Sequence, residues 1–90
     1  MHYVYIIKSL SNGRYYIGET KDLADRMLRH NNNRNKYTRG KGPWKVVIYC
    51  VVEDKSRAVR FERKLKSLKN SRKAIEYIKA HCEAVEHSDF

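Results

Sequence analysis

The alternation of hydrophobic and polar positions predicts two short strands joined by a tight turn near the start of the chain. Residues 3–7 and 15–17 are rich in β-branched and aromatic side chains, and an Asn-Gly pair lies between them. Asn-Gly accepts the positive φ angles of a hairpin turn. In an antiparallel hairpin with an even loop, odd positions of the first strand share a face with even positions of the second. We therefore expect Tyr5 and Tyr16 on one face.

The spacing then changes to that of a helix, which we expect over residues 23–30 with Thr20 or Asp22 as its N-cap. Within this helix Arg26 and His30 are four residues apart, so their side chains lie on one side. Two phenols, a guanidinium and an imidazole would then converge near one hairpin face. A core could be filled by Leu and Val instead, so these side chains indicate a functional site.

The second half of the chain predicts one more strand and two more helices. Residues 44–52 form a nearly continuous apolar run, which fits a buried central strand. Apolar side chains recur at helical spacing over residues 58–68, and a last helix is expected from residue 72 to about 82, capped by Ser71. The expected fold class is α+β, with a three-stranded antiparallel sheet, made of the N-terminal hairpin and the central strand, flanked by about three helices.

One residue of the first of these two helices does not fit its position. At 100° per residue, Glu62 lies about 40° from Ala58 and about 60° from Leu65, on the shoulder of the apolar stripe. A carboxylate there needs an ion pair, a hydrogen bond or a metal ion. Taken by itself, an ion pair with Arg or Lys from a neighbouring element is the simpler interpretation.

A loop rich in Asn and Gly separates the hairpin and its helix from the strand at 44–52. Four of its side chains are basic and one is aromatic: Arg34, Lys36, Arg39, Lys41 and Tyr37. Cations with an aromatic group among them suit phosphate contact plus stacking. A solvated, mobile linker explains the same composition equally well.

Composition adds a strong positive charge to this picture. Twenty Lys and Arg against ten Asp and Glu give the 90-residue chain a net charge of +10, and residues 83–90 contain no Lys or Arg. A protein with this net charge attracts polyanions such as nucleic acids. The simpler interpretation is that the charge only keeps the protein soluble. We expect one domain over residues 1–82 and an acidic, flexible tail over residues 83–90.

Several other classes of protein are disfavoured. No apolar run approaches the roughly 20 residues of a membrane helix, so we expect no membrane partner. The first residues lack the pattern of a signal peptide. Cys50 and Cys82 match no CxxC pattern, which favours reduced thiols in a cytoplasmic protein. His81, Cys82 and His87 match no zinc spacing.

Taken in order, these residues resemble the GIY-YIG nuclease superfamily, in particular its small stand-alone members. Five sets carry the resemblance over residues 2 to about 80: Tyr3-Val4-Tyr5 at the Gly-Ile-Tyr position, Tyr16-Ile17-Gly18, Lys21-Asp22-Leu23 with Arg26 and His30, Tyr37-Thr38 as a loop signature without an assigned role, and Ala58 with Glu62, Leu65 and Lys66. The resemblance implies the fold of that superfamily.

The resemblance also implies a metal-dependent endonuclease that hydrolyses phosphodiester bonds in DNA. Glu62 would be the single protein ligand of one Mg²⁺ or Mn²⁺ ion. Tyr5 would take a proton from the attacking water with Tyr16 beside it, and Arg26 would hold the scissile phosphate. His30 would assist proton transfer or contact phosphate. Lys21 and the basic loop would contact the DNA, and RNA stays open as a partner.

Larger relatives take their specificity from attached domains, and we expect none here. We therefore expect weak or structure-directed selectivity, for branched, flapped or damaged DNA in repair or recombination, or a protein partner that supplies targeting. The alternative is a catalytically weak or inactive nucleic-acid-binding module. Two differences from relatives favour this alternative. Relatives place an Asn beyond the metal-binding Glu, and the only candidate here is Asn70. Some relatives carry a Lys directly after Tyr-Ile-Gly, where this chain has Glu19.

Overall fold

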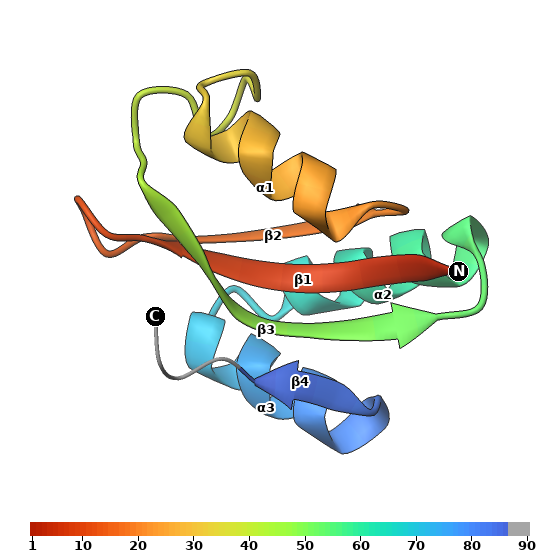
Figure 1. Cartoon of the computed structure of the whole chain (residues 1–90). Coiled ribbons are helices and arrows are strands. Elements are labelled where there is room, and N and C mark those ends of the chain that lie inside the picture. Colours follow the sequence, from red (N-terminus) through yellow and green to blue (C-terminus); the bar gives the residue numbers. More distant parts are fainter. Residues whose placement is uncertain (87–90) are drawn as a thin grey trace.

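The computed structural model describes residues 1–86 and combines a four-stranded sheet with three helices (Figure 1). The elements, in chain order, are β1 (His2–Ser9), β2 (Tyr15–Thr20), α1 (Leu23–Asn31), β3 (Trp44–Val52), α2 (Lys55–Ser67), α3 (Ser71–His81) and β4 (Ala84–Glu86). The sheet is antiparallel, with strand order β2-β1-β3-β4. None of the described helices is both long and apolar enough to cross a membrane.

The prediction of three strands was wrong by one. Residues 84–86, which the sequence assigned to a flexible tail, pair with residues 48–50 of β3. A three-residue strand is too short for its alternation to be recognised, and β4 is held by the backbone of β3 and by an ion pair of 2.9 Å between Lys79 and Glu86. The rest of the expected tail, residues 87–90, lies outside the described residues.

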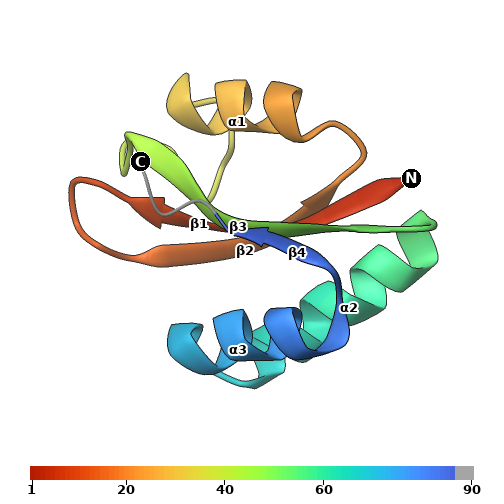
Figure 2. The same cartoon turned by 60° about the horizontal axis from the view of Figure 1, so that its bottom comes forward.

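The helices cover opposite faces of the sheet, with α1 on one face and α2 and α3 on the other (Figure 2). Alternate residues of β1 point to the two faces. Val4 and Ile6 join the aliphatic core beneath α2 and α3, whereas Tyr5 and Ile7 pack with Trp44 on the α1 face. The α1 face is thus the more aromatic of the two.

The register of the hairpin confirms the predicted pairing of faces. Tyr5 lies opposite Gly18 and Ile7 lies opposite Tyr16, so odd positions of β1 pair with even positions of β2. Tyr5 and Tyr16 therefore share the α1 face, as expected from the parity argument.

Each helix begins at a side-chain cap that binds a backbone N–H group three residues further on. Asp22, one of the two positions that the sequence offered, caps α1, and Asp54 caps α2. Ser71 was the wrong cap for α3: the Asn70 carboxamide oxygen accepts the Lys73 N–H group at 3.0 Å, and Ser71 is the first helical residue.

Candidate active site

A chain of three hydrogen-bonded side chains lies at the centre of the site. The Tyr5 hydroxyl oxygen is 3.0 Å from Nε2 of His30, and Nδ1 of His30 is 2.7 Å from Oγ1 of Thr38. All three side chains are fully buried. Because both ring nitrogens of His30 are engaged and no part of it is exposed, the arrangement favours proton transfer over phosphate contact for this residue.

His30 is held in its neutral form. Burial, with the nearby charge of Arg26 as a second cause, lowers the pKa of His30 to about 4. A neutral imidazole has one N–H donor and one acceptor nitrogen. If the Tyr5 hydroxyl donates to Nε2, then Nδ1 carries the proton and donates to Thr38. The chain therefore has a direction along which a proton from Tyr5 can move.

Several charged and polar groups surround the Tyr5 hydroxyl. Burial raises the pKa of Tyr5 well above its ordinary value, and Tyr16 and the Glu62 carboxylate raise it further. Arg26 opposes this increase through its charge and through a side-chain hydrogen bond to Tyr5. Side chains from β2, α1 and α2 thus influence the phenol that β1 supplies.

Gly18 allows the two phenols to come close to the backbone of β2. A Cβ atom at this position would lie 2.5 Å from the Tyr5 hydroxyl oxygen and 3.1 Å from Cε2 of Tyr16. The first distance is too short for any side chain, and the atom in the way belongs to a fully buried ring. The last residue of the Tyr-Ile-Gly motif is therefore explained by packing around Tyr5.

Glu62 reaches the same region from α2, which packs beside the edge strand β2. Its carboxylate lies 3.1 Å from Nζ of Lys66, and its side chain is 20% exposed. This Nζ atom is also 5.9 Å from the centre of the Tyr16 ring. The expected ion pair does form, but its partner is one turn along the same helix and not on a neighbouring element.

The donors around Glu62 fit only a cation that is held by a single carboxylate. Within residues 1–86, no three His, Cys, Asp or Glu side chains are grouped closely enough to hold a metal ion. Mg²⁺ is often bound by one or two carboxylates, with water and substrate phosphate completing the shell. Lys66 contacts Oε1 of Glu62, so such an ion would share the carboxylate with this lysine or displace it.

The predicted residues thus divide into two groups. Five of them gather around the Tyr5 hydroxyl: Tyr5, Tyr16, Arg26, His30 and Glu62. The others are exposed side chains, one before α1 and the rest on the loop after it: Lys21, Arg34, Lys36, Tyr37, Arg39 and Lys41.

The loop itself is fixed to the domain. Its Thr38 is buried, binds His30 and accepts a hydrogen bond of 3.2 Å from the indole N–H of Trp44. Asn31, at the end of α1, binds both the N–H and the carbonyl of Trp44. These bonds are not those of a mobile linker. Sequence reasoning assigned no role to Thr38, and its one signal was its place in the Tyr-Thr loop signature.

Glu19 and Asn70 are the two positions whose differences from relatives favoured an inactive protein. In the structure neither of them lies at the Tyr5 hydroxyl. Glu19 lies opposite Val4, on the face of β2 away from Tyr5, and its carboxylate is 3.5 Å from His2. It does not contribute to the shifted pKa of Tyr5. Asn70 serves as the cap of α3.

Comparison with known proteins agrees with this geometry. The GIY-YIG catalytic domain family matches residues 1–75. UPF0213 protein BH0048 of Halalkalibacterium halodurans is 37% identical over 73 residues, covering 80% of this chain and 77% of that protein. UPF0213 protein VNG_2274C of Halobacterium salinarum is 39% identical over 74 residues, covering 81% and 95%.

A solved structure supports the same assignment. The solution NMR structure of UPF0213 protein BH0048 from Bacillus halodurans is similar with a TM-score of 0.52 at 34% identity, covering 90% of this chain and 85% of that one. The match to the catalytic domain, the relatives and the grouped tyrosines, arginine, histidine and glutamate lead to one conclusion. The chain belongs to the GIY-YIG nuclease family.

Proposed function

We propose that the protein is a metal-dependent endonuclease that hydrolyses phosphodiester bonds in DNA, with branched, flapped or damaged DNA as its preferred substrate. One observation carries this proposal: the Tyr5 hydroxyl, 3.0 Å from Nε2 of His30, lies where the side chains of Arg26, Tyr16 and Glu62 all influence its pKa. A phosphate clamp, a proton acceptor and a carboxylate for a cation are the groups that hydrolysis of a phosphodiester needs.

Substrate binding begins at Arg26. Its guanidinium binds the Tyr5 hydroxyl in the free protein, and a phosphate is a stronger acceptor for such a charged donor. Arg26 therefore turns to the scissile phosphate and stabilises the charge that develops on it. This movement removes one of the groups that cover the fully buried Tyr5.

The proton then passes along the buried chain. Water attacks phosphorus and gives its proton to the Tyr5 oxygen, while the Tyr5 proton moves to Nε2 of His30. The phosphate bound at Arg26 offsets the positive charge that, after burial, lowers the pKa of His30 in the free protein, and this favours the transfer. The resulting imidazolium keeps its bond from Nδ1 to Thr38. Tyr16 is less buried than Tyr5, and its ring centre is 5.3 Å from that of His30, so it orients the attacking water.

Glu62 would hold one Mg²⁺ or Mn²⁺ ion, which polarises the phosphate and stabilises the leaving 3′ oxygen when bound. The negative charge of Glu62 also raises the pKa of Tyr5 in the free protein. A cation at Glu62 would offset this effect of the carboxylate on Tyr5.

A nucleic-acid-binding module of the same fold is the second candidate. Burial of Tyr5 and its raised pKa favour it, because a covered phenol that holds its proton tightly is a poor base.

A cleavage assay separates the two candidates. Labelled branched and linear DNA would be incubated with the protein and Mg²⁺ or Mn²⁺, beside the variants Glu62→Gln and Arg26→Ala. Loss of one transition-state contact typically costs about 100- to 1000-fold in rate, and we expect losses of that size. The matched controls Glu76→Gln and Arg72→Ala change exposed residues of α3 and should cleave normally. Binding without cleavage in either metal supports the module.

A further inference from the structure

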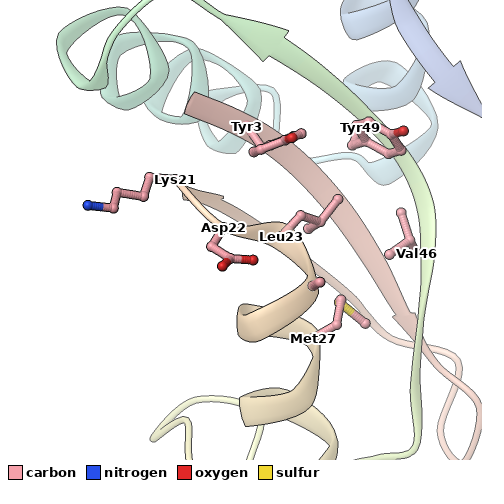
Figure 3. A pocket seen from close by; sticks show the side chains of 8 residues that line it. Tyr3, Lys21, Asp22, Leu23, Met27, Val46 and Tyr49 are labelled. Atoms are coloured by element: carbon pink, nitrogen blue, oxygen red, sulfur yellow. The ribbon is translucent and has the colours of Figure 1, made fainter. Parts of the chain in front are cut away.

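A pocket with a volume of about 610 Å³ lies between α1 and β3, and the cleavage mechanism does not use it. Two tyrosines, Tyr3 and Tyr49, form one end, and Leu23, Met27 and Val46 line its apolar part (Figure 3). Its polar lining is completed by Lys21 and Asp22, where β2 leads into α1. The volume is within the usual range for a small organic ligand.

The pocket shares a wall with the candidate active site. Tyr49 pairs directly with Tyr5 across β1 and β3, and Tyr3 lies two residues before Tyr5 on the same face. Facing residues of neighbouring strands have Cβ atoms about 5 Å apart. A ligand in the pocket would therefore lie next to Tyr5 on the β3 side of β1, while the Tyr5 hydroxyl reaches Gly18 on the β2 side.

The lining suits a flat ring with polar edges. The rings of Tyr3 and Tyr49 have centres 5.9 Å apart and are tilted by 59°, so they present aromatic surface to the hollow. Aromatic side chains of this kind stack on nucleobases in proteins that bind single strands. The Asp22 carboxylate repels a phosphate but accepts hydrogen bonds from amino groups. The end formed by the two tyrosines thus suits a base, whereas Lys21, whose side chain points away from them (Figure 3), suits a phosphate.

A second hollow, of about 370 Å³, continues around the start of α1. Lys21 and Asp22 line both hollows. The second one also contains Arg26 and Lys55, together with Glu19 and an ion pair of 3.0 Å between Arg29 and Asp25. A nucleic-acid strand can thus keep its scissile phosphate at Arg26 while a neighbouring base reaches Tyr3 and Tyr49.

We propose that this pocket binds one unpaired nucleobase next to the scissile phosphate and so selects flapped or single-stranded segments over paired duplex. The proposal rests on the proposed function for its place in cleavage. A base inside a duplex is stacked on both sides and has to be unpaired before it can enter such a pocket.

The two methionines of the chain allow a test in the unmodified protein. Met27 lines the pocket, while Met1 is 82% exposed and does not. We expect the methyl resonance of Met27 to shift through ring currents when a short single-stranded oligonucleotide is added, while that of Met1 stays in place. An oligonucleotide in which every nucleotide is abasic should not cause this shift. An unmoved Met27 methyl on saturation, or an equal shift with the abasic strand, overturns the proposal.

Variants of Tyr3 test the selectivity. Tyr3→Leu keeps apolar bulk but removes the ring, and Tyr3→Phe keeps the ring. Stacking on one aromatic side chain is worth about one to two orders of magnitude in affinity, so we expect Tyr3→Leu to reduce the preference for flapped over paired DNA about tenfold. Tyr3→Phe should retain this preference. The control Tyr15→Leu removes an exposed tyrosine on the face of the sheet away from Tyr3 and should leave the preference unchanged.

The two experiments fail in different ways. If flapped DNA is cleaved but Tyr3→Leu leaves the preference unchanged, the pocket proposal is wrong and the proposed function stands. If no DNA is cleaved with either metal but Met27 still responds to unpaired bases alone, the pocket binds a base and the proposed function is wrong.

Discussion

At the scale of single residues, the site depends on a threonine that does no chemistry itself. Thr38 engages Nδ1 of His30 and thereby fixes which nitrogen faces Tyr5. Its backbone carbonyl also binds the Trp44 indole, so it ties the loop to β3. We regard Thr38 as a positioning residue.

Replacing the hydroxyl tests this role. Thr38→Val has nearly the same shape but leaves Nδ1 of the buried imidazole without a partner, which typically costs about 1–3 kcal/mol. We expect a loss of that size in the free energy of unfolding, measured with urea. Thr38→Ser keeps the hydroxyl and should recover most of this loss. Equal stability of Thr38→Val and the unmodified protein would contradict the hydrogen bond.

The lowered pKa of His30 makes stability depend on pH. Unfolded His30 takes up a proton near pH 6.5, whereas folded His30 does so only near pH 4. Between these values the unfolded state binds the extra proton, so stability falls as the pH falls. Each pKa unit corresponds to about 1.4 kcal/mol, which gives a loss of about 3 kcal/mol from pH 7 to pH 4.

A variant without the imidazole isolates this contribution from those of the other histidines. Urea unfolding of His30→Gln should show a smaller decrease in stability between pH 7 and pH 5 than the unmodified protein. Identical slopes would mean that His30 is protonated as readily in the folded state as in the unfolded one.

At the scale of elements, the helix caps separate structural from catalytic roles. Asn70 uses its carboxamide oxygen to cap α3. Loss of such a cap typically costs about 1 kcal/mol. We therefore expect Asn70→Ala to lower the free energy of unfolding, measured with urea, by that amount. Its cleavage rate per folded molecule should stay unchanged. A strongly reduced rate at full folding would instead assign Asn70 a part in the reaction.

The strands and helices that bury long apolar patterns could be predicted from sequence, and so could the gathering around Tyr5. That Tyr5 and Tyr16 share a face follows from strand parity alone, and that Arg26 and His30 share one side of α1 follows from helical spacing. The role of Thr38 could not be predicted, because loop geometry decides which residue reaches His30. Nor could β4, since pairing to β3 and not its own composition makes those residues a strand.

At the scale of the whole molecule, positive charge governs encounter with a polyanion. The fixed loop after α1 exposes four cations, Arg34, Lys36, Arg39 and Lys41. Each phosphate contact contributes about 0.9 to the slope of log affinity against log salt concentration. We expect the double variant Lys36→Ala, Arg39→Ala to reduce the magnitude of this slope by up to about two for duplex DNA.

The double variant Arg72→Ala, Lys73→Ala is a control with the same change in net charge. Its substitutions lie on α3, on the face of the sheet opposite α1 (Figure 2). A slope that changes equally in both double variants would mean that overall charge, and not the loop, binds the nucleic acid.

The short fourth strand has a consequence for the molecule in a crowded solution. β3 is the most β-prone segment of the chain, and β4 occupies its outer edge at residues 48–50. A bare edge of this kind recruits strands from other molecules. Residues 84–86 lie beyond the part that matches the catalytic domain family. A chain shortened to that match would still contain the side chains proposed for catalysis. It would end within α3 and leave residues 48–50 of β3 without their partner strand, so we expect it to self-associate more readily.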